Sequence, residues 1–436
     1  MRTRSLAGAA ATALAFSLLA SGPALADNKR YHGDGNRKIE VSTTKDTVDA
    51  RPGDRRCADT YGKCSLRAAV QEANASGGGS IVLKKGTYVL TRAGSGDETA
   101  SATGDLDITS KITISGNGAT VDARGIDRVF DVLPRASLSL RDVTVTGGAA
   151  KGTGLPASGG GVRNAGTLLV EHSTITRNTA VRAGGGIEAS EGSTTKLSKS
   201  TLSKNSTGAG PGNGGGLHLT GVGTVRVDRS SVTGNTASSE GGGLWNSGLG
   251  TMTVDDSTIA WNRASGAEAT MGGGGLFQEA GASGRLTVTG SEIAHNVADG
   301  ASGSGGGILN DQGTLVVERT TIRDNKAVRA GGGIEANVGT TTLERTTLTG
   351  NKTGANPGNG GGLHLTGAGK VRIDRSSVTH NSASAEGGGL WNSATGTMTV
   401  TKTEIRRNSA PVGRDVYQDG TGTGFTIDGR TVPATP

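Results

Sequence analysis

Aromatic residues are scarce in this chain of 436 residues, where Phe, Trp and Tyr together make up 3%. Proline occurs only nine times, and no Gly-X-Y period accompanies the 77 glycines, so a collagen-like triple helix is excluded. The Lys and Arg residues are scattered, form no run of five or six, and have no aromatic residues interleaved with them. We therefore expect no nucleic-acid partner, because such a partner requires a clustered basic face.

Long apolar runs are confined to the N-terminus. Arg2 and Arg4 precede an apolar run from Leu6 to Ala20, and ALA at 24–26 is a small-x-small cleavage pattern. This arrangement is typical of a secretory signal peptide over residues 1–26, with cleavage before Asp27. A membrane anchor is the alternative, but the run is short for a span and no second apolar stretch of about 20 residues follows. We expect a secreted, extracellular protein with no membrane span.

The chain contains only two cysteine residues, Cys57 and Cys64. Two cysteines in an exported protein most often form a disulfide, which is our prediction for this pair. A metal site is the alternative, but no His lies close enough in the sequence to complete one. The six His residues are all separated, so we expect no metal site built from them.

Glycine, by contrast, is abundant and marks an internal repeat. Residues 214–240, GGGLHLTGVGTVRVDRSSVTGNTASSE, return almost unchanged at 360–386. Nine units begin with a triple glycine, at residues 159, 184, 214, 241, 273, 305, 331, 360 and 387. Units one to four match units six to nine, so residues 159–271 are duplicated as 305–404. Such a duplication lengthens a stack of repeats without requiring a new fold.

Each unit continues with an alternating stretch and closes with Asn. In TVRVDRSSVTGN, Val225, Val227 and Val232 share one face, a period of two that predicts strands rather than a helix. One unit cannot bury this face alone, so the units must stack, with about three parallel strands in each coil. The glycines permit a positive φ or a close approach at the corner before the first strand. The closing Asn residues should form a hydrogen-bonded ladder along the stack: Asn178, Asn205, Asn235, Asn262, Asn296, Asn325, Asn351, Asn381 and Asn408.

These patterns resemble the right-handed parallel β-helix class, the pectin-lyase-like superfamily. The GGG-aliphatic-x-Asn units resemble repeats of the polymorphic outer-membrane protein family. CSLRAAVQEAN at 64–74 resembles the CSLREA motif that precedes such helices in secreted bacterial proteins. The resemblance covers about residues 55–430. It implies an all-β, right-handed parallel β-helix solenoid of about twelve coils with a short N-terminal capping helix.

The capping helix also follows from the residues themselves. Ser65 can N-cap a helix in which Leu66, Ala69, Val70 and Ala73 share one apolar face. We expect a flexible arm over 27–54, the cap and early coils over 55–158, and the nine GGG units over 159–404. Residues 405–436 then form a C-terminal cap and tail.

The variable residue after each aliphatic residue should point outward on the first strand of its unit. Tryptophan outside a core is unusual, and contiguous exposed aromatics next to Glu, His and Arg favour the binding of sugar rings. The alternative is that duplication copied an indifferent surface on which a loop covers the Trp residues. The predicted binding row reads Arg163, Glu188, His218, Trp245, Phe277, Leu309, Glu335, His364 and Trp391, and all of these except Leu309 are the expected ligand-binding residues.

From these features we expect a monomeric, non-catalytic protein that binds polysaccharide, cell wall or another surface ligand. The alternative is a polysaccharide lyase or glycoside hydrolase of the pectin-lyase-like type, with Glu188, His218 and Arg163 as the catalytic candidates. No cofactor is expected, and Ca²⁺ enters only if the protein is a lyase. Neither the paired carboxylates of a hydrolase nor the base and charge neutralisation of a lyase is evident in the sequence.

Overall fold

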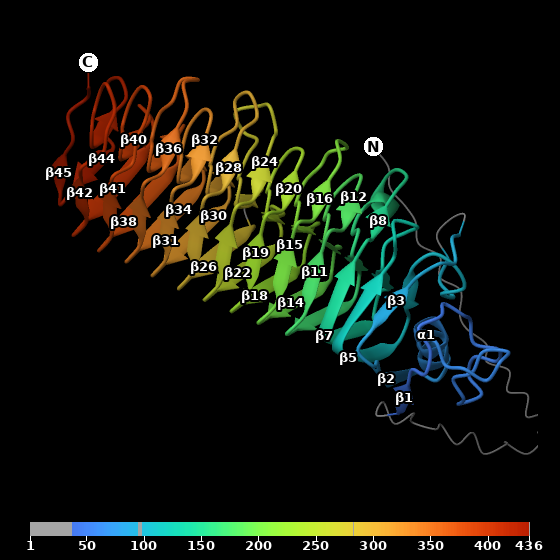
Figure 1. Ribbon diagram of the computed structural model, residues 1–436. Coiled ribbons are helices and arrows are strands. Elements are labelled where there is room, and N and C mark those ends of the chain that lie inside the picture. The colour runs from blue at the N-terminus through green and yellow to red at the C-terminus, as the bar shows by residue number, and fades with distance from the viewer. Residues whose placement is uncertain (1–36, 95–97, 282, 436) are drawn as a thin grey trace, which may run out of the picture. The chain divides into compact units, whose positions relative to one another are not determined.

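The computed structural model describes residues 37–94, 98–281 and 283–435. The expected signal peptide, 1–26, and residues 27–36 of the expected arm lie outside these ranges. The described chain is a parallel β-helix whose coils stack in chain order, blue to red in Figure 1. Three sheets, which we call A, B and C, run along the stack. Sheet B contains twelve strands, one in each coil. This confirms the predicted all-β solenoid of about twelve coils.

The strands divide among the sheets as follows, and all pair in parallel except the last two of sheet A. Sheet B contains β4 (Leu106–Ile108), β6 (Phe130–Val132), β9 (Val162–Asn164), β13 (Ile187–Ala189), β17 (Leu217–Leu219), β21 (Leu244–Asn246), β25 (Leu276–Gln278), β29 (Ile308–Asp311), β33 (Ile334–Asn337), β37 (Leu363–Thr366), β40 (Leu390–Asn392) and β43 (Val416–Gln418). Sheet C contains β8 (Ala149–Ala150), β12 (Thr179–Ala180), β16 (Ser206–Thr207), β20 (Thr236–Ala237), β24 (Arg263–Ala264), β28 (Val297–Ala298), β32 (Lys326–Ala327) and β36 (Lys352–Thr353). Sheet A contains β1 (Lys38–Glu40), β2 (Gly78–Val82), β3 (Thr87–Val89), β5 (Lys111–Asp122), β7 (Ser137–Thr146), β10 (Thr167–Glu171), β11 (Thr174–Thr176), β14 (Thr194–Ser198), β15 (Thr201–Ser203), β18 (Thr224–Asp228), β19 (Ser231–Thr233), β22 (Thr251–Asp255), β23 (Thr258–Ala260), β26 (Arg285–Thr289), β27 (Glu292–Ala294), β30 (Thr314–Glu318), β31 (Thr321–Arg323), β34 (Thr340–Glu344), β35 (Thr347–Thr349), β38 (Lys370–Asp374), β39 (Ser377–Thr379), β41 (Thr397–Thr401), β42 (Glu404–Arg406), β44 (Phe425–Ile427) and β45 (Arg430–Thr431).

A typical repeat coil has four strands rather than the expected three. In the coil that starts at Gly214, β17 lies in sheet B, β18 and β19 in sheet A, and β20 in sheet C. The alternating stretch is divided because Arg229 adopts a left-handed conformation, with φ +44°, and turns the chain within sheet A. Val225, Val227 and Val232 all face the core and are fully buried, as their alternation predicts.

The triple glycine forms a tight hook before the sheet B strand. Gly214 has φ +63°, and a Cβ at this position would lie 2.5 Å from the carbonyl oxygen of Leu217 and 2.6 Å from Cβ of His218. Both the conformation and the close approach therefore require glycine, as expected. The hook consequently packs directly against the side chains that point outward from sheet B.

The predicted Asn ladder is present along the repeat coils. Nδ2 of Asn178 donates to Oδ1 of Asn205 at 3.0 Å, and the same oxygen accepts the backbone N–H of Asn178. The pattern continues through every predicted ladder residue to Asn408, whose Nδ2 donates to Asp415 at 2.9 Å. Each fully packed amide thus replaces the backbone partners that the corner lacks.

A second ladder of hydroxyl groups, which the sequence did not suggest, follows the corner within sheet A. The backbone N–H of Ser200 donates to Oγ of Ser230 at 3.0 Å, and that of Ser230 to Ser257 at 3.0 Å. Each hydroxyl also donates to a carbonyl two residues earlier, as Ser230 does to Asp228 at 2.8 Å. Small hydroxyl residues at this corner therefore satisfy the buried backbone groups of the turn.

The capping helix α1 (Leu66–Ala75) begins where the sequence predicted. Oγ of Ser65 accepts a hydrogen bond from the backbone N–H of Ala68 at 3.0 Å. The side chain of Asn74 donates to the carbonyl of Asp107 at 2.7 Å and accepts from the N–H of Thr109 at 3.0 Å. Asn74 thereby occupies the hydrogen-bonding groups at the open edge of β4, as the next strand of a sheet would.

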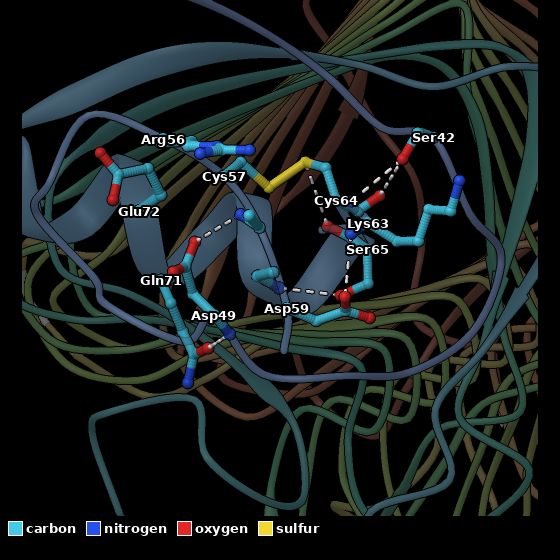
Figure 2. Close-up of a disulfide and its surroundings, with 12 residues drawn as sticks. Ser42, Asp49, Arg56, Cys57, Asp59, Lys63, Cys64, Ser65, Gln71 and Glu72 are labelled. Carbon is cyan, nitrogen blue, oxygen red and sulfur yellow. Dashed lines mark hydrogen bonds between the residues drawn. A yellow bond between two sulfur atoms is a disulfide. The ribbon is translucent and has the colours of Figure 1, made fainter. Parts of the chain in front are cut away.

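Cys57 and Cys64 form the predicted disulfide next to this helix, with 5.1 Å between their Cα atoms (Figure 2). The N–H of Cys64 donates to Oγ of Ser42 at 3.0 Å, and the N–H of Asp49 donates to Oε1 of Gln71 on α1 at 2.8 Å. The segment 37–54 therefore differs from the flexible arm expected over 27–54. It adds β1 to sheet A beside β2 and buries Ile39 and Val41 against the cap.

The C-terminal end of the stack is closed by the expected segment. After β43, the chain places β44 beside β41 and then turns back into β45, the antiparallel strand. The N–H of Thr435 donates to the carbonyl of Gln418 at 3.0 Å, so the tail covers part of the last sheet B strand. One further short 3-10 helix spans Leu155–Ala157. Within the described ranges, no helix has the length and apolar character needed to cross a bilayer.

Candidate functional site

The outward side chains of sheet B form one continuous row through twelve coils, which we call the outer row. The pairing of neighbouring strands places every residue of the predicted binding row next to its predicted neighbour, so its alignment is confirmed. The structure extends the row at both ends, with Asp107 and Asp131 before Arg163 and with Tyr417 after Trp391. Because these three residues belong to strands without a triple glycine, counting from the glycines did not find them.

The expectation that this row is an exposed stripe is wrong. Only 1% of Glu188, 4% of His218 and 5% of Trp245 is exposed, and Glu335, His364 and Trp391 are similarly buried. The row points away from the main core, but the glycine hooks and the segments before them cover it. The alternative considered from the sequence, a loop over the Trp residues, describes the structure.

Beneath this cover, each Glu of the row lies within hydrogen-bonding distance of the His in the next coil. Nδ1 of His218 lies 3.0 Å from Oε2 of Glu188, and the hydroxyl of Thr220 donates to Oε1 of Glu188 at 2.6 Å. Arg182 approaches the same carboxylate at 4.0 Å. The second block repeats the arrangement with Glu335, His364, Thr366 and Arg329 in corresponding places. Burial by itself would raise the pKa of Glu335, but His364 and Arg329 hold it below its ordinary value.

In both Trp residues of the outer row, the indole N–H donates a hydrogen bond to a carboxylate of the protein. Nε1 of Trp245 donates to Glu240 at 3.0 Å, and its ring stacks on His218 with 4.2 Å between centroids. Trp391 makes the equivalent contacts with Glu386, at 2.9 Å, and with His364, at 4.1 Å. Because no face of either indole is open to solvent, this duplicated Glu–His–Trp arrangement stabilises the stack and offers no stacking surface to a ligand.

The N-terminal end of the outer row is an acidic cluster of Asp105, Asp107 and Asp131. One oxygen of each carboxylate lies within 4.8 Å of the others, and all three side chains are buried. Arg128 donates to Asp105 at 3.0 Å, and Nε of Arg163 donates to Asp131 at 2.9 Å. The meeting of these three acids was not predicted from the sequence.

The acidic cluster is electrically balanced by its own arginines. Burial raises the pKa of Asp105 well above its ordinary value, although Arg128 opposes the shift. Burial, with Glu98 and Asp131 nearby, raises the pKa of Asp107 to about 7, and one of its oxygens accepts no hydrogen bond. A divalent cation such as Ca²⁺ needs six to eight oxygen ligands, whereas two of these three carboxylates already bind guanidinium groups. The residues therefore do not fit a resident cation.

The exposed tryptophan is Trp261, which the sequence analysis did not single out. It follows β23 at the corner before Asn262, and 65% of it is exposed. One face of its indole stacks on the ring of His295 in the next coil, with 4.2 Å between centroids and 16° between planes. The available signal was its position directly before a ladder Asn, where the strand has ended and a side chain points to solvent.

Comparison with known proteins identifies the family to which this β-helix belongs. The family model described as right handed beta helix region matches residues 106–259 and 186–364, which together span more than half of the chain. No curated protein matches the sequence. Among solved structures, the chain is similar to the A-module of mannuronan C-5 epimerase AlgE4 from Azotobacter vinelandii, with a TM-score of 0.47, 13% identity, and coverage of 85% of this chain and 98% of that chain. It is also similar to pectate lyase Pel9A, with a TM-score of 0.33, 15% identity, and coverage of 92% of this chain and 82% of that chain. The chain therefore belongs to the right-handed β-helix region family.

Proposed function

We propose that this protein is an exported β-helix that binds a polysaccharide or another surface polymer without cleaving it. The observation that carries the proposal is the exposed indole of Trp261, fixed in orientation by its stack on His295. An aromatic face held open to solvent is suited to stacking on the apolar face of a sugar ring. Polysaccharides present many such rings in sequence, and a stiff solenoid offers them a fixed surface.

The burial of the outer row supports a role without catalysis. Glu188 and His218, the catalytic candidates from the sequence, are covered and bonded to each other. Arg163, the third candidate, is engaged with Asp131. A general acid or base must reach the proton that it transfers, and the burial of Glu188 and His218 leaves these two groups no open path to a polymer.

Export is part of the same proposal and rests on the pattern of residues 1–26. The disulfide between Cys57 and Cys64 is consistent with an oxidising compartment. N-terminal sequencing of the protein recovered from culture medium tests this step, and we expect the mature chain to begin at Asp27.

A second candidate function, a lyase or hydrolase, is favoured by one observation. Asp107 has a pKa raised to about 7 and lies next to Asp131, and a carboxyl group with such a pKa is suited to general acid–base chemistry. Both groups are buried, however, so substrate would have to reach them through the covering segments.

One experiment separates the two functions. Purified protein is incubated with a panel of neutral and acidic polysaccharides, with and without Ca²⁺, and both retention on the polymer and new reducing ends are measured. We expect retention without new reducing ends, and a loss of retention in Trp261→Ala. New reducing ends or unsaturated products, abolished in Asp107→Asn, would establish the enzyme instead.

A further inference from the structure

Trp261 belongs to a second row of outward residues, which we call the corner row. It consists of the residue before each ladder Asn, and every member has a positive φ: Arg177, Lys204, Gly234, Trp261, His295, Asp324, Gly350, His380 and Arg407. The backbone N–H of each of the first six members bonds to the next coil, as Gly234 does to Ala260 at 3.1 Å and Trp261 to Ala294 at 3.1 Å. Neighbouring members are therefore about 4.8 Å apart, the spacing of adjacent strands.

The choice of tryptophan at this corner is costly for the fold. A bulky residue with φ +59° is an outlier among protein residues, because its Cβ crowds the neighbouring backbone. The exposed indole contributes little buried area in return. Glycine, which occupies two other positions of the corner row, would avoid the strain altogether.

The two faces of the indole have different surroundings. One face is covered by His295, whereas the coil on the other side carries Gly234 and thus no side chain. The next residue with a side chain in that direction is Lys204, whose backbone lies two coils, or about 10 Å, from that of Trp261 along the row. A flat ring that stacks on the free indole face at roughly 4–5 Å would fill the coil of Gly234.

We call the space above Gly234, beside the free face of Trp261, the notch. Lys204 gives the notch a positive charge. Its Cγ lies 3.9 Å from the point where a Cβ on Gly234 would be, so the stem of the side chain extends along the glycine. Among the described residues, Lys204 has no carboxylate within ion-pair distance. Arg263, on the same side of the corner, is engaged by Asp299 at 2.6 Å. The notch therefore contains one ammonium group that is available to a ligand.

The duplicated block provides an internal comparison. The ladder residues show that Lys204, Gly234 and Trp261 correspond to Gly350, His380 and Arg407 in the second block. The scaffold is the same, and the buried Trp245 is retained as Trp391, but Arg407 stands where the first block has the exposed Trp261. The exposed indole is therefore no requirement of the coil geometry.

We propose that Trp261, Gly234 and Lys204 bind one ring of an acidic polysaccharide, while His295 holds the indole from its other face. The apolar face of a pyranose stacks on Trp261 above Gly234, and the carboxylate of a uronic acid pairs with the ammonium group of Lys204. This inference rests on the proposed polysaccharide binding and names its ligand class, a polyuronate.

The test compares polygalacturonate and alginate with their methyl-esterified forms, which keep the rings and remove the charge. We expect wild-type protein to bind at least one acid form about ten-fold or more tightly than its ester. Trp261→Ala should lose about ten-fold or more in affinity for both forms, whereas Lys204→Gln should lose only the preference for the acid. His380→Ala, at a corner position without tryptophan, is the matched control and should bind as wild type does.

Tryptophan fluorescence gives a direct readout, because Trp245 and Trp391 are buried and Trp261 is exposed. Acrylamide should quench mainly Trp261, and bound polyuronate should protect it. A gain-of-function variant, Gly350→Lys with His380→Gly and Arg407→Trp, should bind a second polyuronate chain segment for each molecule.

The outcomes distinguish the inference from the function on which it rests. Unchanged polyuronate affinity in Trp261→Ala, with binding otherwise intact, would overturn the site. Equal binding of acid and ester forms, unaffected by Lys204→Gln, would overturn the acidic ligand class and leave polysaccharide binding standing. If wild-type protein binds no polysaccharide of the wider neutral and acidic panel, the proposed function itself fails.

Discussion

Nδ2 of Asn262 donates a hydrogen bond to Oδ1 of Asn296 at 3.0 Å, although 34 residues separate the two in the chain. The same Nδ2 group donates to the carbonyl of Val232 at 2.9 Å, one coil back. Oδ1 of Asn262 in turn accepts from both N–H groups of Asn235, at 3.0 Å each. A single amide thus joins three successive coils at their buried corner.

Removing the amide of Asn262, which lies in the middle of the stack, should lower the stability of the folded protein. Asn262→Leu keeps the volume but leaves buried groups of Val232 and Asn235 without partners, at roughly 1–3 kcal/mol for each group. We expect a clear fall in the midpoint of thermal unfolding, measured by circular dichroism. Thr224→Ala, an exposed change in β18, is the control and should stay within about 0.5 kcal/mol of wild type. Equal midpoints for the two variants would contradict a structural role of the ladder.

The two kinds of tryptophan should separate stability from binding. Trp245→Ala removes a buried ring that stacks on His218, which typically costs about 3–5 kcal/mol. Trp261→Ala removes a mostly exposed ring and keeps the same left-handed backbone, so the free energy of unfolding should change by less than about 0.5 kcal/mol. Urea unfolding followed by circular dichroism measures both. A large loss of stability in Trp261→Ala would show that its ring supports the fold.

The acidic cluster should make stability depend on pH through Asp107. Its pKa is about 7 in the folded state against an ordinary value of 3.8, so the folded state holds an extra proton between these values. Stability should therefore fall as pH rises from about 4 to about 7, by an amount on the order of a few kcal/mol.

Asp107→Asn should remove this contribution, because an amide does not ionise. The difference between the unfolding midpoints of the variant and of wild type should grow from pH 4 to pH 7 in favour of the variant, and then level off. Asp105 shifts in the same direction, and Asp107 contributes to the raised pKa of Asp105, so the difference reports the loss of Asp107 together with its effect on Asp105. A constant difference across the range would show that Asp107 does not titrate as stated.

Loss of the disulfide should loosen the cap and leave distant coils unchanged. Cys57 and Cys64 are seven residues apart, and closing so short a loop is worth about 2–3 kcal/mol in the chain-entropy account. In the double Ser variant, hydrogen exchange in α1 should accelerate, while β38, far along the stack, should stay protected because coils contact only their neighbours. Wild-type protein treated with a reductant should show the same pattern. Faster exchange throughout the stack would show instead that the cap controls the whole solenoid.

Much of the fold could be predicted from the sequence because its information is local and repeated. Alternation of Val225, Val227 and Val232 assigns the buried face of one strand pair, and nine copies of the pattern fix how the coils align. The ladder Asn residues and the N-cap at Ser65 were likewise found, since each acts on backbone groups a few residues away or one coil away. Segment 37–54 was not, because β1 is held by distant partners that its own polar residues do not reveal.

The candidate site was predicted only in part. The sequence aligned Glu188, His218 and Trp245 along one row, but it placed the row in solvent, where the structure has it covered. A triple glycine signals a sharp turn, yet it carries no side chain that would indicate on which side of the row the chain passes. The acidic cluster escaped for a similar reason, because Asp107 and Asp131 belong to coils of irregular length whose alignment no repeat defines.

The sequence by itself determined the repeating coil, its inward face, its Asn ladder and the order of the outer row, because each depends on short periods and on pairing between equivalent positions. Only the tertiary structure decided which outward residues meet solvent. Trp245 and Trp261 have the same chemistry and lie 16 positions apart, but a glycine hook covers one and the turn at the corner leaves the other open. Exposure depends on the path of segments that pass over a surface, and that path is fixed by packing between coils rather than by the residue it covers.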